Sequence, residues 1–172
     1  MIRSYDGIEP DIADSAYVDR MATVIGDVTL GPKASVWPGV VLRGDHGSII
    51  LEEGVNIQDN ATLHEGVRMA PYSTVGHNAI VHAAEVGSRA MVGMGAIVLD
   101  GSTVGEKSLV GANSVVTNDT DIPASVMVAG APAEVVREVD ESPWHTASDR
   151  YVQLSREHAA TSEVIAEEHR PE

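Results

Sequence analysis

Three of the seven histidines in the chain stand at spacings that metal chemistry can use. His82 follows His64 by 18 positions and follows His77 by five. Imidazole nitrogens bind zinc at about 2.0–2.1 Å, and three of them leave a fourth position open for water. Because the chain has no cysteine, any transition-metal site must consist of histidine and carboxylate side chains. His64 and His82 can meet only if the fold stacks positions that far apart in the sequence.

A six-residue repeat supplies that stacking. The repeat slips by three residues at His46-Gly47-Ser48 and loses one residue between Val81 and Val86. With these two adjustments, one position of the repeat is always aliphatic, at Ile12, Val18, Val24, Leu30, Val36, Leu42, Leu51, Ile57, Leu63, Met69, Val75, Val81, Val86, Val92, Val98, Val104, Val110, Val116 and Ile122. The period fits neither an α-helix nor a simple hairpin sheet.

The repeat predicts a parallel β-helix, in which three six-residue repeats, each with one short strand, form one triangular coil. Small residues precede the aliphatic position by two, and glycine often follows it, as a backbone that turns every six residues requires. The span from residue 12 to 122 has room for roughly six coils. Neighbouring coils are about 4.8 Å apart, so His64 and His82, which are three repeats apart, would lie one above the other.

The C-terminal part has a different pattern. Prolines interrupt the repeat between residues 122 and 133, where we expect the coils to end. We predict a β-helix domain over residues 1–139 and a second unit over 140–172, with one α-helix over 147–168 folded back along the prism. One face of that helix would carry Tyr151, Leu154, His158 and Ile165. The charged tail over 167–172 is expected to fray.

His77 lies across a corner of the coil from His82, so it cannot easily join the pair of its own chain. A threefold trimer would bring the His77 face of one prism against the His64 and His82 face of another. Each interface would then hold three histidine ligands and one open position, which is typical of a catalytic metal ion.

The same phase argument places four further residues. Arg43 falls one coil before His64 in the same column, and Asp59 lies one coil, or three repeats, before His77. Arg43 and Asp45 of one subunit would form an ion-pair network with Asp59 of the next. Gln58 would be placed to hydrogen-bond an oxygen bound to the metal.

Composition excludes several classes of function. The chain carries 11 basic and 26 acidic residues, a net charge of −15, which disfavours nucleic acid and anionic membranes as partners. Only Lys33 and Lys107 are lysines, so we expect a halophilic protein whose acidic surface is screened by high salt. The sequence has neither a run of about 20 apolar residues nor a signal-peptide pattern, which favours a cytoplasmic location.

Several motifs together resemble the gamma-class carbonic anhydrase family over about residues 8–140. They are Arg43-Gly44-Asp45, Asn56-Ile57-Gln58-Asp59-Asn60, Leu63-His64 and Val75-Gly76-His77-Asn78-Ala79-Ile80-Val81-His82. The resemblance implies an all-β, left-handed parallel β-helix that assembles as a homotrimer. It also implies Zn2+, or Fe2+ or Co2+, bound across the interface by His64, His77 and His82. Arg43, Asp45 and Asp59 would support the interface, and Gln58 would contact the bound water or bicarbonate.

The implied activity is that of a lyase, in which a metal-bound hydroxide attacks carbon dioxide and yields bicarbonate. The sequence departs from the family in its proton-transfer groups. His46 stands where a glutamate follows the Arg-x-Asp motif, and the short Glu65-Gly66-Val67 segment leaves no acidic loop. His46 could itself move protons, and Tyr151 is a further candidate. The shortened form resembles relatives whose hydration activity is weak, absent or redox-dependent.

Two other functions fit the same fold. Acyltransferases share the six-residue repeat, and an acyl-CoA thioesterase could use the same metal site on a thioester. A non-catalytic trimeric scaffold, with the metal holding the subunits together, is the second alternative. The matched histidines weigh against a transferase, and an open ligand position weighs against a scaffold.

Overall fold

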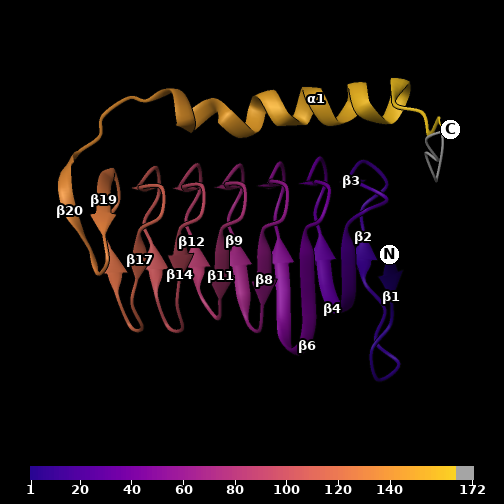
Figure 1. Cartoon of the computed structure of the whole chain (residues 1–172), viewed down its shortest axis with the longest axis horizontal. Coiled ribbons are helices and arrows are strands. Elements are labelled where there is room, and N and C mark those ends of the chain that lie inside the picture. The colour runs from indigo at the N-terminus through magenta and orange to yellow at the C-terminus, as the bar shows by residue number, and fades with distance from the viewer. Residues whose placement is uncertain (166–172) are drawn as a thin grey trace, which may run out of the picture.

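Short parallel strands stack into a β-solenoid, and one helix follows it in the computed structural model (Figure 1). The structure describes residues 1–165. This architecture confirms the predicted parallel β-helix of six-residue repeats with a single C-terminal helix. Within the described residues, no helix is long and apolar enough to cross a membrane.

Three faces make up the prism. The first face contains β3 (Tyr17–Val18), β5 (Ser35–Val36), β7 (Asn56–Ile57), β10 (Thr74–Val75), β13 (Met91–Val92), β16 (Leu109–Val110) and β19 (Val126–Gly130). The second contains the start of β6 (Val41–Leu51), then β8 (Thr62–His64), β11 (Ile80–His82), β14 (Ile97–Val98) and β17 (Val115–Val116). The third contains the end of β6, then β9 (Val67–Met69), β12 (Glu85–Val86), β15 (Thr103–Val104) and β18 (Asp121–Ile122). At the N-terminal end, β4 (Thr23–Leu30) pairs with β6 and also with β1 (Ile2–Arg3) and β2 (Asp11–Ile12).

The aliphatic position of the repeat forms the core. From Val24 to Ile122 every one of these side chains is at most 5% exposed, while Ile12 and Val18 are partly buried against the same cluster. Each buried Val, Leu or Ile contributes about 1.5–3 kcal/mol to folding. Since successive residues of a strand point to opposite sides, the residue after each core position faces outward.

The solenoid is longer than the sequence predicts. The first face has seven parallel strands because β19 adds a coil after Ile122, with Val126 and Val128 buried. A final strand, β20 (Ala133–Glu138), then pairs antiparallel with β19. The repeat therefore continues past Pro123 by one coil and ends at Gly130, within the expected segment. Pro123 and Pro132 fall between strands, where no ladder hydrogen bond requires their missing N–H.

The helix α1 (Ala147–Thr161) follows a 3-10 turn, η1 (Pro143–Thr146), and lies along the prism (Figure 1). Arg89 fixes its beginning: one guanidinium nitrogen donates to the His145 carbonyl at 2.7 Å and to Asp149 Oδ2 at 2.9 Å. Ser148 Oγ donates to the Tyr72 carbonyl at 2.7 Å. The helix therefore returns along the coils that precede it.

The end of the helix differs from the prediction. α1 stops at Thr161, because Ser162 has extended backbone angles. Ile165 is 99% exposed, so its assignment to the packed helix face was wrong. The rest of the expected helix and the predicted frayed tail, residues 166–172, lie outside the described residues.

Candidate metal centre

Arg43, His64 and His82 form one column on the second face. The strands β6, β8 and β11 are parallel neighbours, and their register pairs Arg43 with His64 and His64 with His82. The aliphatic residue before each of them is fully buried, so these three side chains project outward together. The repeat thus places two histidines and an arginine at adjacent positions of three successive coils.

The two histidines point one ring nitrogen toward each other, and a carboxylate contacts the other nitrogen of each ring. His64 Nδ1 and His82 Nε2 are 3.2 Å apart. The other ring nitrogens face carboxylates: His64 Nε2 donates to Asp45 Oδ1 at 3.0 Å, and His82 Nδ1 donates to Asp100 Oδ1 at 2.6 Å. In a neutral imidazole only one nitrogen carries hydrogen, so the two converging nitrogens present lone pairs to each other.

This donor set fits a divalent metal ion. Two nitrogens bound to one tetrahedral zinc ion at about 2.0–2.1 Å stand roughly 3.3–3.4 Å apart. The observed 3.2 Å is close to that separation. Facing lone pairs repel unless a cation lies beside them, and metal-bound histidines commonly donate their second N–H to a carboxylate, as both do here.

Arg43 and Asp45 add charge beside the pair. Arg43 Nη1 donates to Asp45 Oδ2 at 2.6 Å, and Arg43 Nη2 donates to His64 Nδ1 at 3.2 Å. The guanidinium is therefore the cation that meets the His64 lone pair within the single chain. Burial opposes ionisation of Asp45, but hydrogen bonds from Arg43 and His64 outweigh it and lower the pKa of Asp45 to about 2.

His77 and Asp59 form a separate pair, and Gln58 directly precedes Asp59 in the chain. His77 Nδ1 lies 2.9 Å from Asp59 Oδ2, and the backbone of Asn78 hydrogen-bonds to Asp59 one coil below. Among residues 1–165, no group of three or more ligand atoms within 4.8 Å of one another includes His77. Gln58 is 3% exposed, and its Oε1 has no hydrogen-bond partner in the described chain. The structure thus keeps His77 apart from the His64 and His82 pair.

The two proton-transfer candidates lie in different places. His46 is beside the pair, with Nδ1 3.5 Å from Asp45 Oδ1 and a side chain that is 69% exposed. Tyr151 packs on Trp37, with the ring centroids 5.5 Å apart. Burial, assisted by the negative charge of Asp59, raises the pKa of Tyr151, so its phenol keeps its proton.

Two carboxylates near the pair were missed by the sequence analysis. Asp100 contacts His82, and Glu65 forms a cluster with His64 and His82 in which one ligand atom of each lies within 4.8 Å of the others. Glu65 could have been found because it directly follows His64. Asp100 had no such signal.

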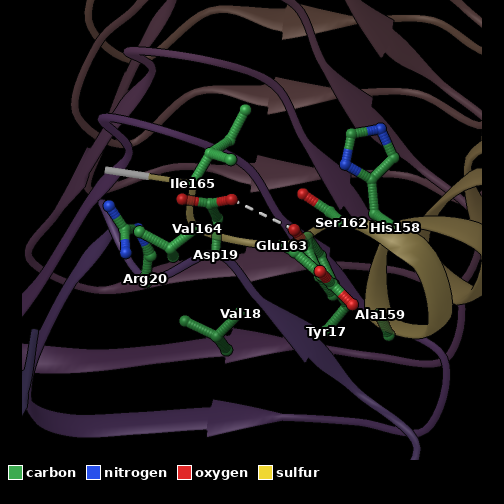
Figure 2. Close-up of a pocket in the computed structure, with 10 residues that line it drawn as sticks. All are labelled: Tyr17, Val18, Asp19, Arg20, His158, Ala159, Ser162, Glu163, Val164 and Ile165. Carbon is green, nitrogen blue, oxygen red and sulfur yellow. Dashed lines mark hydrogen bonds between the residues drawn. The ribbon is translucent and has the colours of Figure 1, made fainter. Parts of the chain in front are cut away.

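A cavity of about 450 Å³ lies elsewhere, beside the end of α1 (Figure 2). Its lining includes Tyr17, Asp19, Arg20 and His158, and Tyr17 Oη donates to Asp19 Oδ2 at 3.0 Å. No predicted site residue lines it. The histidine pair instead stands on an outer face of the prism.

Comparison with known proteins gives the family. The chain is 41% identical over 145 residues to a protein of Geobacillus kaustophilus named carbonic anhydrase, covering 82% of this chain and 80% of the relative. It is 35% identical to gamma carbonic anhydrase 2, mitochondrial, of Arabidopsis thaliana, covering 88% of this chain and 59% of the relative. A solved structure from Bacillus cereus, described as a putative acetyltransferase, superposes with a TM-score of 0.85 at 32% identity, covering 92% of this chain and 96% of that one. No family model matches.

The fold and the histidine pair define a β-solenoid protein with a potential metal site. Its resemblance to the Geobacillus relative extends over most of both sequences. The chain belongs to the gamma carbonic anhydrase-like family of hexapeptide-repeat proteins, as its motifs predict.

Proposed function

We propose that the protein catalyses the reversible hydration of carbon dioxide to bicarbonate at metal sites between the subunits of a homotrimer. The observation that carries this proposal is the convergence of His64 Nδ1 and His82 Nε2, which are 3.2 Å apart. The second ring nitrogen of each histidine contacts a carboxylate, that of Asp45 or Asp100. Zn2+ is the proposed ion, with Fe2+ or Co2+ as alternatives. The name of the Geobacillus relative supports the reaction.

His64 and His82 of one subunit and His77 of a neighbouring subunit are the proposed ligands. His77 Nδ1 contacts Asp59, so its Nε2 is the nitrogen available to a second chain. A divalent ion in this site would lower the pKa of bound water toward about 7 and so supply a nucleophile for carbon dioxide. The carboxylates around the proposed site outnumber the single cation, Arg43, so a divalent ion would reduce a net negative charge. They belong to Asp45, Asp59, Asp100 and Glu65.

The remaining groups have proposed roles in binding and proton transfer. Gln58 has a buried oxygen that lacks a donor within residues 1–165, and a hydrogen bond at the subunit interface would satisfy it. His46 and Glu65 are the titratable groups placed beside the pair to take up the released proton. The proposed location is the cytoplasm.

An acyl-transfer or thioesterase activity is the second candidate. The description of the Bacillus cereus structure as an acetyltransferase favours it, since that chain is 32% identical and superposes over most of its length. The carboxylate-held histidine pair disfavours a transferase, because a single general base would need neither the second imidazole nor converging lone pairs.

The decisive experiment compares the wild-type protein with His82→Ala after anaerobic purification in high salt. We expect about one metal per subunit and carbon dioxide hydration in stopped flow for the wild type, and loss of both in the variant, because one of three ligands is missing. His158→Gln serves as a control, since it removes an imidazole that lies on α1 away from the pair.

Each outcome separates the candidates. Bound metal with no hydration, but with hydrolysis of acyl-CoA, would replace the proposal with a thioesterase. Bound metal with neither activity, and a trimer that dissociates when the metal is chelated, would indicate a scaffold. A wild-type protein without metal would contradict the metal centre itself.

A further inference from the structure

We propose that Asp100 is a positioning residue that holds His82 in the tautomer and orientation needed to bind metal. This inference rests on the metal site of the proposed function, and it does not depend on which reaction follows. Asp100 would act through His82 and would touch neither the metal nor the substrate.

The contact is short and specific. Asp100 Oδ1 lies 2.6 Å from His82 Nδ1. Within residues 1–165, His82 is the only side chain that hydrogen-bonds to this carboxylate, whereas Asp45 is shared between Arg43 and His64. The carboxylate of Asp100 therefore has no other interaction in the described chain that would explain its orientation.

The backbone places Asp100 firmly. It occupies a tight turn over residues 99–102, closed by a hydrogen bond from Ser102 N to the Leu99 carbonyl at 3.3 Å. Gly101 has a φ of +71°, which a turn of this kind requires and which glycine adopts without strain. The turn is also fixed to its neighbours, because Gly101 N donates to the Ala83 carbonyl and Asp119 N donates to the Asp100 carbonyl, each at 2.8 Å.

The consequence for His82 is chemical. A carboxylate on Nδ1 keeps the hydrogen on that nitrogen and leaves the lone pair on Nε2, which faces His64. Without Asp100, the tautomer with hydrogen on Nε2 becomes accessible, and the ring, which is 30% exposed, loses its restraint. Such outer partners of metal-bound histidines typically contribute 10- to 100-fold to metal affinity.

The test is a titration of the metal-free full chain with Co2+, followed by visible absorption, for the wild type, Asp100→Ala and Asp100→Asn. We expect the dissociation constant for Co2+ to rise about 10- to 100-fold in Asp100→Ala. It should rise less in Asp100→Asn, because an amide oxygen can still accept the Nδ1 hydrogen. Asp119→Asn is the matched control: it lies one coil further on and has no contact with His82, so its affinity should equal that of the wild type.

If Asp100 only stabilised the fold, the Co2+ affinities and melting temperatures of the variants would follow a different pattern. Equal Co2+ affinity in all variants would overturn the inference, as would an affinity loss that accompanies a lower melting temperature of the metal-free Asp100 variants. The same samples are assayed for hydration. A wild-type protein that binds Co2+ but does not hydrate carbon dioxide contradicts the proposed reaction alone, whereas one that binds no Co2+ overturns this inference as well.

Discussion

Asp45 accepts hydrogen bonds from the Arg43 guanidinium and the His64 imidazole. The contribution of these contacts to stability depends on pH. The pKa of Asp45 is lowered to about 2, whereas an unfolded chain has an aspartate pKa near 3.9. A lowered pKa contributes stability that is present above about pH 4 and lost as the pH falls toward 2. The charge of Asp45 thus favours the folded state at neutral pH.

We therefore expect the free energy of unfolding of the metal-free wild type to fall more steeply between about pH 4 and pH 2 than that of Asp45→Asn. Urea midpoints measured across this range provide the comparison. Asp121→Asn is the control, because Asp121 is exposed and makes no side-chain hydrogen bond in the described chain. Parallel curves for the wild type and Asp45→Asn would contradict the prediction.

Single residues also show how far the sequence could lead. The pairing of His64 with His82 was predictable because three whole repeats separate them and the repeat is unbroken there. Asp100 was not, because the residue lost between Val81 and Val86 shortens the next coil, and Val98 pairs with Val81 at a spacing of 17. Leu99 thus takes the place in the column, and Asp100 contacts His82 from the corner beyond it.

Among the elements, β6 depends on close backbone contact with β4. The two strands pair with a register shift between Gly26 and Val28, beside the Arg43-Gly44-Asp45 motif. A Cβ atom added at Gly44 would lie 2.3 Å from the Asp27 carbonyl oxygen. The glycine between the two charged site residues is therefore required by packing.

Gly44→Ala should destabilise the protein by about 1–3 kcal/mol, since the strands must separate to admit the methyl group. It should also weaken metal binding, because Arg43 and Asp45 move with the strand. Urea denaturation and Co2+ titration measure the two effects. Gly66→Ala is the matched control, because a Cβ there meets no atom within 4 Å; equal stability of the two variants would contradict the packing argument.

The elements were predictable to different degrees. Core strands follow from the aliphatic repeat, because burial selects one side-chain type at a fixed phase. Strand β20 could not be predicted from this repeat, since Val135 and Val136 are exposed and follow no period of six. The end of α1 was also missed, because good helix formers continue beyond Thr161 while the backbone turns away at Ser162.

In the whole molecule, the two parts of the proposed site are on different elements. His64 and His82 are on strands β8 and β11, whereas His77 and Asp59 lie in turns between the first and second faces. If a second subunit completes the site, two variants damaged in different parts should repair each other. The geometry therefore makes the proposed trimer testable by mixing subunits.

His77→Ala and His82→Ala should each be inactive alone. Co-assembled in equal amounts, they should recover about one quarter of wild-type hydration, because about one in four interfaces then combines an intact pair with an intact His77. Mixing His64→Ala with His82→Ala is the control: both changes affect the same part, so no mixed interface is intact. Confirmed mixed trimers without recovered activity would rule out a shared site.

The path of α1 has a consequence for how the protein unfolds. In a stack whose coils contact only their neighbours, end coils can open one at a time. Here the chain leaves the last coil and is held by Arg89, which lies about midway along the solenoid. The helix α1 then packs against β3, β5 and β7 near the first coils. Opening either end therefore also disturbs the helix that spans the other coils. The contacts of α1 thus connect the two ends of the solenoid, so that opening of an end coil is coupled to global unfolding.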